Sequence, residues 1–190
     1  MTRSNISIIL VLMGIALAVH VQADCIGPPV NDATITLVKS FEGWVPDIYP
    51  DPDGHATAGY GHLCADPQCS DVSYPIPLSE QDGELLLRED ITIAQQCITL
   101  QTAGPVTLND NQYGALVSWA FNVGCGNVAS STLIARMNVG EDANTVASEE
   151  LPRWKYGDGG VLPGLVRRRA AEVDLFKTSS DIPALPVGCS

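Results

Sequence analysis

Residues 41–62 read FEGWVPDIYPDPDGHATAGYGH, and the abrupt change of character within this stretch decides the fold. Upstream of it, apolar residues recur at helical spacing, and either Asn31 or Asp32 can cap that helix. The helix should end near Gly43, because a proline follows three residues later. Beyond it the chain is rich in Gly, Pro, Asp and Tyr, with an Asp-Gly turn signal in the middle. We expect a first helix that leads into a small antiparallel sheet over residues 47–63.

The remainder of the chain is mostly helical in pattern. Ser79 can cap a long helix from residue 80 to about residue 99, because its apolar residues recur on one stripe. Asn109 and Gln112 suit a variant capping box for a helix that ends at Gly124. Three more helices are expected over residues 131–140, 142–151 and 165–176, with a loop over residues 154–160 between the last two.

This order of elements predicts an α+β fold with two lobes. One lobe holds the small antiparallel sheet, the other is larger and helical, and the helix from residue 80 joins them. A cleft between two lobes is a common place for a ligand site, and we expect the active site there.

Two carboxylates and a hydroxyl around the turn are candidates for chemistry. Glu42 lies between Phe41 and Trp44, and an apolar surround would disfavour its ionised form, as a carboxylic general acid requires. Asp51 precedes the turn in a polar segment and should stay ionised, while the Thr57 hydroxyl could hold a water molecule near it. Two carboxyl groups in different environments form the pair that cleaves glycosidic bonds. The alternative is a helix-end charge and a turn-capping aspartate.

Length and charge limit the function classes. The chain has 190 residues, 45% of them hydrophobic, which is enough for one domain with a sizeable core. Its formal net charge of -12 argues against nucleic acid or an acidic membrane as a partner bound by general electrostatics.

Residues 1–23 are typical of a secretory signal peptide. Arg3 supplies the positive start, an apolar run extends over residues 6–21, and Val21-Gln22-Ala23 resembles a cleavage site. A membrane anchor is the rival interpretation, but the run is short for a span and no basic cluster follows. We expect a secreted, extracellular mature chain over residues 24–190 that forms one catalytic domain without a membrane partner.

All six cysteines lie in that mature part, and an even number in an exported chain indicates disulfides. One pair is close in sequence, one pair lies at the two ends of the domain, and one pair remains. The expected pairs are Cys64 with Cys69, Cys25 with Cys189, and Cys97 with Cys125.

Metal sites are disfavoured. A zinc site at His62, Cys64 and Cys69 would have only three ligands and would lie in an oxidising compartment. The calcium-loop likeness of residues 51–54 lacks the third acidic position and the closing glutamate.

Three stretches together resemble the phage-type lysozymes, the family 24 glycoside hydrolases. Glu42, Asp51 and Thr57 stand at the spacing Glu-x8-Asp-x5-Thr within the opening stretch. NQYGALVSWAFNVG, residues 111–124, resembles the family's central buried helix and the turn after it, and LPGLVRRRAAE, residues 162–172, resembles its C-terminal helix.

The resemblance implies a lysozyme-like fold and hydrolysis of the β-1,4 bond between N-acetylmuramic acid and N-acetylglucosamine in bacterial peptidoglycan, with no cofactor. It implies that Glu42 donates a proton to the leaving oxygen, that Asp51 assists the water or stabilises the positive sugar centre, and that Thr57 orients the water. By position it also implies a structural pair, His62 with Asp90, and sugar contacts on the cleft floor, Phe121 and Asn122.

The chain departs from the usual cytosolic, basic phage enzyme by its export signal, its cysteines and its acidic balance. The family often places an arginine near the catalytic glutamate, and Arg167 and Arg168 are the candidates here. Trp119 and Trp154 are as well explained by the core as by the site.

Other functions remain open. An uncharged N-acetylglucosamine polymer such as chitin suits an acidic protein, and a non-catalytic glycan-binding protein could use the same fold. A disulfide-rich interaction or inhibitor protein is a third class. We expect a monomer with peptidoglycan as its substrate and no nucleic-acid partner.

The charge is divided unevenly along the chain. Residues 24–150 hold 18 acidic and 3 basic groups, whereas residues 151–177 hold 6 basic and 3 acidic groups. We expect the basic segment to border the cleft and meet the anionic peptides of the wall, and the activity to favour acidic pH.

Overall fold

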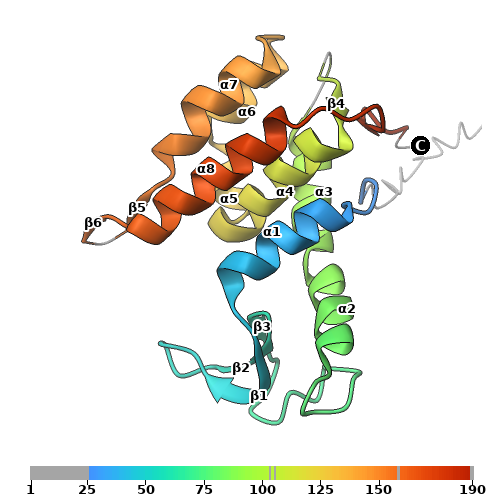
Figure 1. Cartoon of the computed structure of the whole chain (residues 1–190), viewed down its shortest axis with the longest axis vertical. Coiled ribbons are helices and arrows are strands. Elements are labelled where there is room, and N and C mark those ends of the chain that lie inside the picture. The colour runs from blue at the N-terminus through green and yellow to red at the C-terminus, as the bar shows by residue number, and fades with distance from the viewer. Residues whose placement is uncertain (1–25, 103, 105, 158, 189–190) are drawn as a thin grey trace, which may run out of the picture.

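The computed structural model describes residues 26–102, 104, 106–157 and 159–188. The expected two-lobed α+β arrangement is confirmed. A small sheet forms one end of the molecule, a larger group of helices forms the other, and α2 (Glu80–Asp90) with α3 (Thr92–Gln101) runs between them (Figure 1).

The first helix and the sheet follow the sequence closely. The Asn31 side chain accepts a hydrogen bond from the Thr34 N–H and caps α1, Asp32–Glu42. The helix ends at Gly43, whose φ of 76° is readily adopted only by glycine, and the chain then enters the sheet. The strands are antiparallel in the order β1 (Val45–Pro50), β2 (Ala56–Gly59), β3 (His62–Leu63).

The long helix predicted from residue 80 is two helices, α2 and α3, although Ser79 caps the first as expected. The backbone hydrogen bonds continue across Ile91, which accepts from the Gln95 N–H at 3.0 Å. The Thr92 hydroxyl donates to the Glu89 carbonyl at 2.6 Å. Such a side-chain bond competes with the backbone ladder and bends a helix, which accounts for the interruption.

The helical lobe is built around α4, Asp110–Val123, whose middle is buried on all sides. Asn109 and Gln112 form the expected capping box, and Trp119 is fully buried with Trp154 at its edge. The helices α1, α3, α5 (Cys125–Ala129) and α8 (Pro163–Lys177) pack against α4. The rest of the lobe consists of α6 (Thr132–Asn138), α7 (Ala143–Glu150) and the 3-10 turn η1 (Leu151–Arg153).

Some short elements were not expected. The predicted loop over residues 154–160 contains a hairpin of β5 (Tyr156–Gly157) and β6 (Gly160–Val161). β4 (Leu108–Asn109) pairs with β7 (Pro183–Leu185), and α5 was not anticipated. Segments of two to five residues are too short for a periodic pattern, so tertiary contacts decide them.

Two expected disulfides are confirmed. Cys64–Cys69 closes the loop beside the sheet, and Cys97–Cys125 joins α3 to the start of α5. The expected Cys25–Cys189 pair and the proposed signal peptide lie outside the described residues. Among the helices that the structure describes, none has the length and apolarity needed to cross a membrane.

Candidate active site

Glu42 is the last residue of α1, and its carboxylate is paired with an arginine of α8. Glu42 Oε1 lies 2.6 Å from Arg168 Nη1. The Arg168 side chain is 4% exposed and that of Glu42 is 23% exposed, so the carboxylate lies at the surface and the guanidinium behind it. An apolar surround was expected for Glu42, but its carboxylate is paired with this arginine, and the Phe41 ring lies under the guanidinium. Arg167 is exposed, which identifies Arg168 as the arginine beside the acid.

Arg168 is itself held from behind by a second carboxylate. Its Nε lies 3.3 Å from Glu172 Oε1, and its Nη2 donates to the Ser118 carbonyl at 3.3 Å. Glu172 is fully buried, and its Oε1 also accepts from the Ser118 hydroxyl at 2.9 Å. Burial raises the pKa of Glu172 to about 6, against the opposing effect of the two neighbouring arginines.

Glu172 also holds a second arginine, which reaches a residue predicted to contact sugar. Arg169 Nε lies 2.7 Å from Glu172 Oε2, and Arg169 Nη2 donates to Asn122 Oδ1 at 2.9 Å. Burial lowers the pKa of Arg169. Asn122 is exposed and Phe121 is half-buried against the core, and their sugar contacts stay predictions.

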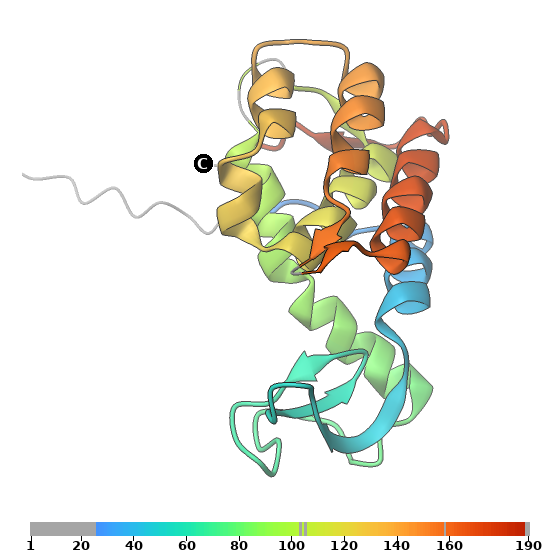
Figure 2. The same ribbon diagram turned by 90° about the vertical axis from the view of Figure 1, so that its left-hand side faces the viewer.

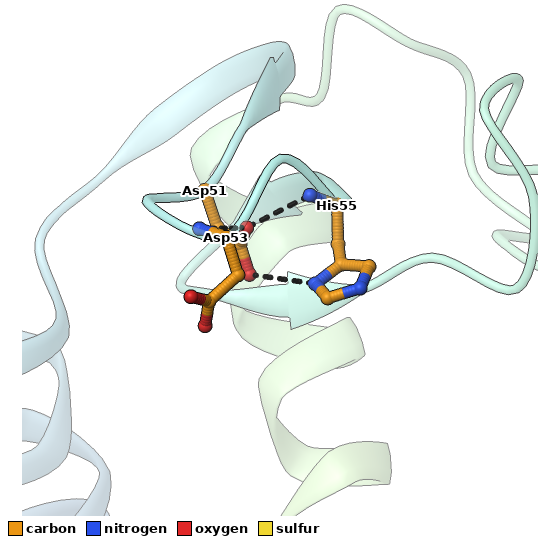
Figure 3. A group of neighbouring side chains, drawn as sticks. All are labelled: Asp51, Asp53 and His55. Atoms are coloured by element: carbon orange, nitrogen blue, oxygen red, sulfur yellow. Dashed lines mark hydrogen bonds and ion pairs between the residues drawn. The ribbon is translucent and has the colours of Figure 1, made fainter.

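Asp51 is held in the turn by backbone hydrogen bonds (Figure 3). Its Oδ1 accepts from the N–H groups of Asp53 at 2.9 Å and His55 at 2.8 Å, and its Oδ2 lies 3.5 Å from His55 Nδ1. The bond from the His55 N–H contributes most to holding the pKa of Asp51 below its usual range. This agrees with the expectation that Asp51 stays ionised.

Thr57 is connected to Asp51 through the backbone of the same turn. The Thr57 hydroxyl donates to the His55 carbonyl at 3.2 Å, and that carbonyl also accepts from the Asp51 N–H at 2.8 Å. Thr57 lies opposite Tyr49 in the sheet and is buried. The His55 carbonyl therefore connects the Asp51 backbone with the Thr57 side chain, while the role of Thr57 toward water stays a prediction.

The structure also bears on the two metal sites considered from the sequence, a zinc site at His62, Cys64 and Cys69 and a calcium loop at residues 51–54. Cys64 and Cys69 are joined in a disulfide, so they cannot act as thiolate ligands, and the zinc interpretation is excluded. Ligand atoms of Asp51, Asp53 and His55 lie within 4.8 Å of one another. The Asp51 oxygens are already engaged within the turn, which explains their closeness without a cation.

The predicted pair of His62 with Asp90 is present, with Nδ1 and Oδ1 2.8 Å apart. The sequence did not indicate the second partner, Asp71, which lies 3.0 Å from His62 Nε2. Asp71 comes from an irregular loop, where no periodicity predicts which way a side chain points. His62 thus ties the sheet to both α2 and this loop.

The residues that sequence reasoning missed are those behind the acid: Ser118, Arg169 and Glu172. The sequence contained part of the evidence that these charges interact, because residues 168, 169 and 172 lie at i, i+1 and i+4 on one helix. What the sequence did not reveal is that this face of α8 is buried against α4, which makes the charges an internal network.

A cavity elsewhere in the structure is not a competing site. It is lined by residues near the end of α3 and by the C-terminal strand, and none of the lining side chains is ionisable. The end of α3 and the strand β7 lie at the end of the helical lobe away from the sheet (Figure 1). The charged groups described above therefore form the better candidate for catalysis.

Comparisons with known proteins agree with this assignment. The chain is 38% identical over 153 residues to the endolysin of Bacillus phage PZA, and it spans 56% of that relative's length. It is 35% identical over 154 residues to the endolysin of Acyrthosiphon pisum secondary endosymbiont phage 1, of which it covers 99%.

Solved structures show the same fold. The muramidase domain of SpmX from Asticaccaulis excentricus has 32% identity and a TM-score of 0.65, with coverage of 79% of this chain and 98% of that one. A mutant of P22 lysozyme has 28% identity and a TM-score of 0.67, with coverage of 80% and 99%. A family model described as phage lysozyme matches residues 39–172, which include all the charged groups that surround Glu42 and Asp51. By its fold, its site and this match, the chain belongs to the phage lysozyme family.

Proposed function

We propose that this chain is a secreted lysozyme that hydrolyses the β-1,4 bond between N-acetylmuramic acid and N-acetylglucosamine in bacterial peptidoglycan. The observation that carries the proposal is the placement of two carboxyl groups, one at the end of α1 and one in the turn between β1 and β2. Glu42 is paired with a buried arginine at the junction of the lobes, whereas Asp51 is held ionised in an exposed turn. Endolysins and a muramidase domain among its relatives support the same chemistry.

In this mechanism Glu42 donates a proton to the glycosidic oxygen as the bond breaks. A positive charge develops on the sugar ring, and the negative charge of Asp51 stabilises it or activates the attacking water. The backbone N–H groups of residues 53 and 55 keep Asp51 in its anionic form, so it does not compete for the proton. Thr57 is proposed to orient the water, and Phe121 and Asn122 to contact the sugars.

A second substrate is favoured by one observation, the net charge of -12. Peptidoglycan carries anionic peptides, whereas chitin is an uncharged polymer of N-acetylglucosamine. An acidic enzyme approaches an uncharged polymer without electrostatic repulsion. Chitin is therefore the alternative substrate to compare with bacterial walls.

The proposed experiment compares both substrates with a matched pair of variants. Wild-type protein should clear a suspension of bacterial walls and release little sugar from chitin. Glu42→Gln should lower wall lysis by at least about 100-fold, because a general acid contributes roughly that factor or more. Asp174→Asn, a similar change at an exposed position of α8, should retain wild-type lysis.

Equal activity of wild type and Glu42→Gln on both substrates would overturn the enzyme assignment. Activity on chitin alone would show that chitin, and not peptidoglycan, is the substrate.

We also propose that residues 1–23 are removed on export and that the mature protein acts as a monomer. N-terminal sequencing of the exported protein tests the removal of residues 1–23, because a retained anchor would leave residue 1 at the start. Light scattering tests whether the mature protein is a monomer.

A further inference from the structure

Glu172 is a buried charged residue for which the mechanism above has no use. It is fully buried on α8, and its two oxygens contact Arg168, Arg169 and the Ser118 hydroxyl. A buried carboxylate is costly unless charges and hydrogen bonds compensate it. We therefore ask which functional residues the contacts of Glu172 hold in place.

The two arginines fixed by Glu172 lead to the site. Arg168 continues to Glu42 at 2.6 Å, and Arg169 continues to Asn122 at 2.9 Å. One buried carboxylate on α8 thus sets the direction of two guanidinium groups, one toward α1 and one toward the end of α4. Both end residues are among those that the proposed function uses.

The charge of Arg168 is also a problem for a general acid. A guanidinium at hydrogen-bond distance favours the ionised form of a carboxyl group, whereas Glu42 must carry a proton at the moment of bond cleavage. Glu172 faces the same guanidinium from the other side at 3.3 Å. Glu42, Arg168, Glu172 and Arg169 form an alternating row of charges with no net charge when all are ionised.

The other elements that pack against this part of α8 do not alter that balance. From α4, Ser118 donates to Glu172, and Asn122 accepts from Arg169. From α7, Glu149 and Glu150 are both paired with Arg136, and Glu150 also lies 3.5 Å from Arg153 of η1. Glu172 is therefore the negative charge that the described contacts place against both arginines.

We propose that Glu172 is a positioning residue that directs Arg168 to Glu42 and offsets its charge, so that Glu42 can hold the proton it donates. This inference rests on the proposed function of Glu42. It also assigns to Glu172, through Arg169, the placement of the Asn122 side chain.

The test is Glu172→Gln, which keeps the shape of the side chain and removes its charge. Carbon-13 NMR of labelled glutamate carboxyl groups, with the Glu42 signal assigned from Glu42→Gln, follows the protonation of Glu42 directly. We expect the midpoint of the Glu42 titration to fall by about one pH unit in Glu172→Gln. In that variant no negative charge offsets Arg168, so the guanidinium favours the ionised form of Glu42 more strongly. The basic limb of the pH profile for wall lysis should move down by a similar amount, with kcat lowered more than KM is raised.

Two variants separate positioning from support of the fold. Glu172→Asp retains the charge and should restore the wild-type midpoint, even where thermal stability is reduced. Asp174→Asn makes the same change of charge at an exposed position of the same helix and should leave the midpoint unchanged. An unchanged Glu42 midpoint in a folded Glu172→Gln protein would overturn the proposal.

If Glu172→Gln does not fold, the wild-type titration decides. The Glu42 signal should show a second inflection at the pH at which Glu172 itself titrates, since the two carboxyl groups are coupled through Arg168. A single inflection with no response to Glu172 would overturn the proposal. These signals do not depend on turnover, so a failure of the proposed function, seen as wall lysis that survives Glu42→Gln, is recognised separately.

Discussion

At the scale of single residues, His62 shows how a polar contact can connect parts of the fold that are distant in sequence. Its ring bonds to Asp90 on α2 and Asp71 in the loop, at 2.8 and 3.0 Å. Burial disfavours protonation of the ring, but the hydrogen bonds to the two carboxylates outweigh it and raise the pKa of His62 above 6.5. Burial also raises the pKa of Asp90, which helps the pair to retain its proton.

This raised pKa has a consequence for stability. The folded protein holds the His62 proton more tightly than the unfolded chain, so the ion pairs contribute fully below pH 6.5 and their contribution is lost as the pH rises through the raised value. His62→Gln should lower the free energy of unfolding by about 1–3 kcal/mol at pH 6. The difference from wild type should shrink toward pH 9, as measured by urea denaturation.

His55→Gln provides the control, because His55 is 65% exposed and reaches Asp51 only at 3.5 Å. It should change the stability by less than about 0.5 kcal/mol at any pH in this range. A His62→Gln effect that stays constant from pH 6 to pH 9 would contradict the assigned ion pairs.

At the scale of elements, the position of Glu42 depends on how closely α1 packs on α4. A Cβ added at Gly114 would lie 1.8 Å from Thr34 Oγ1, so the two helices touch at a point where only glycine fits. Gly114→Ala should therefore force the helices apart and cost about 1–3 kcal/mol in unfolding free energy. Because α1 carries Glu42, the specific activity should fall as well, and thermal unfolding with a wall-lysis assay measures both.

Gly164→Ala in α8 is the matched control, since a Cβ there meets nothing within 4 Å. Alanine should be neutral or stabilise that helix by up to about 1 kcal/mol. Equal effects of the two substitutions would show that helix propensity, and not the contact of α1 with α4, decides the outcome.

At the scale of the whole molecule, we expect charge to influence how the enzyme meets its substrate. Arg168 and Arg169 are buried and paired, so they cannot meet the wall as the basic segment was expected to do. The exposed basic residues of the segment are Arg153, Arg167 and Lys177, with Lys155 half-buried. The β5–β6 hairpin and the start of α8 lie at the side of the helical lobe nearest the sheet, which supports the proposed approach to the site (Figure 2).

The acidic remainder should repel an anionic wall. We expect wall lysis to be faster at about pH 4.5 than at pH 8, because surface carboxylates gain protons only near their ordinary pKa values of about 4. Added salt up to about 0.15 M should accelerate lysis at pH 8 by screening the repulsion. Walls with amidated peptide carboxyl groups serve as the control and should show neither effect. An optimum clearly above neutrality on untreated walls would contradict this expectation.

The sequence by itself determined the order of the longer elements and the places of Glu42 and Asp51 at a helix end and in a turn, while their catalytic roles stay predictions. A capped helix that ends at Gly43, a turn around Asp51 and a capping box at Asn109 are local features, so their physical causes lie within a few residues of chain. The disulfides Cys64–Cys69 and Cys97–Cys125 were also predicted correctly from spacing and from elimination.

Only the tertiary structure decided what surrounds those carboxylates. Arg168 meets Glu42 across 126 positions of sequence, and the Ser118–Glu172 bond joins α4 to α8. The sequence suggested an apolar surround for Glu42 because its chain neighbours are aromatic, whereas packing brings α8 and its charges against it. A side chain's electrostatic environment is set by whichever elements pack against it, and local sequence does not contain that information.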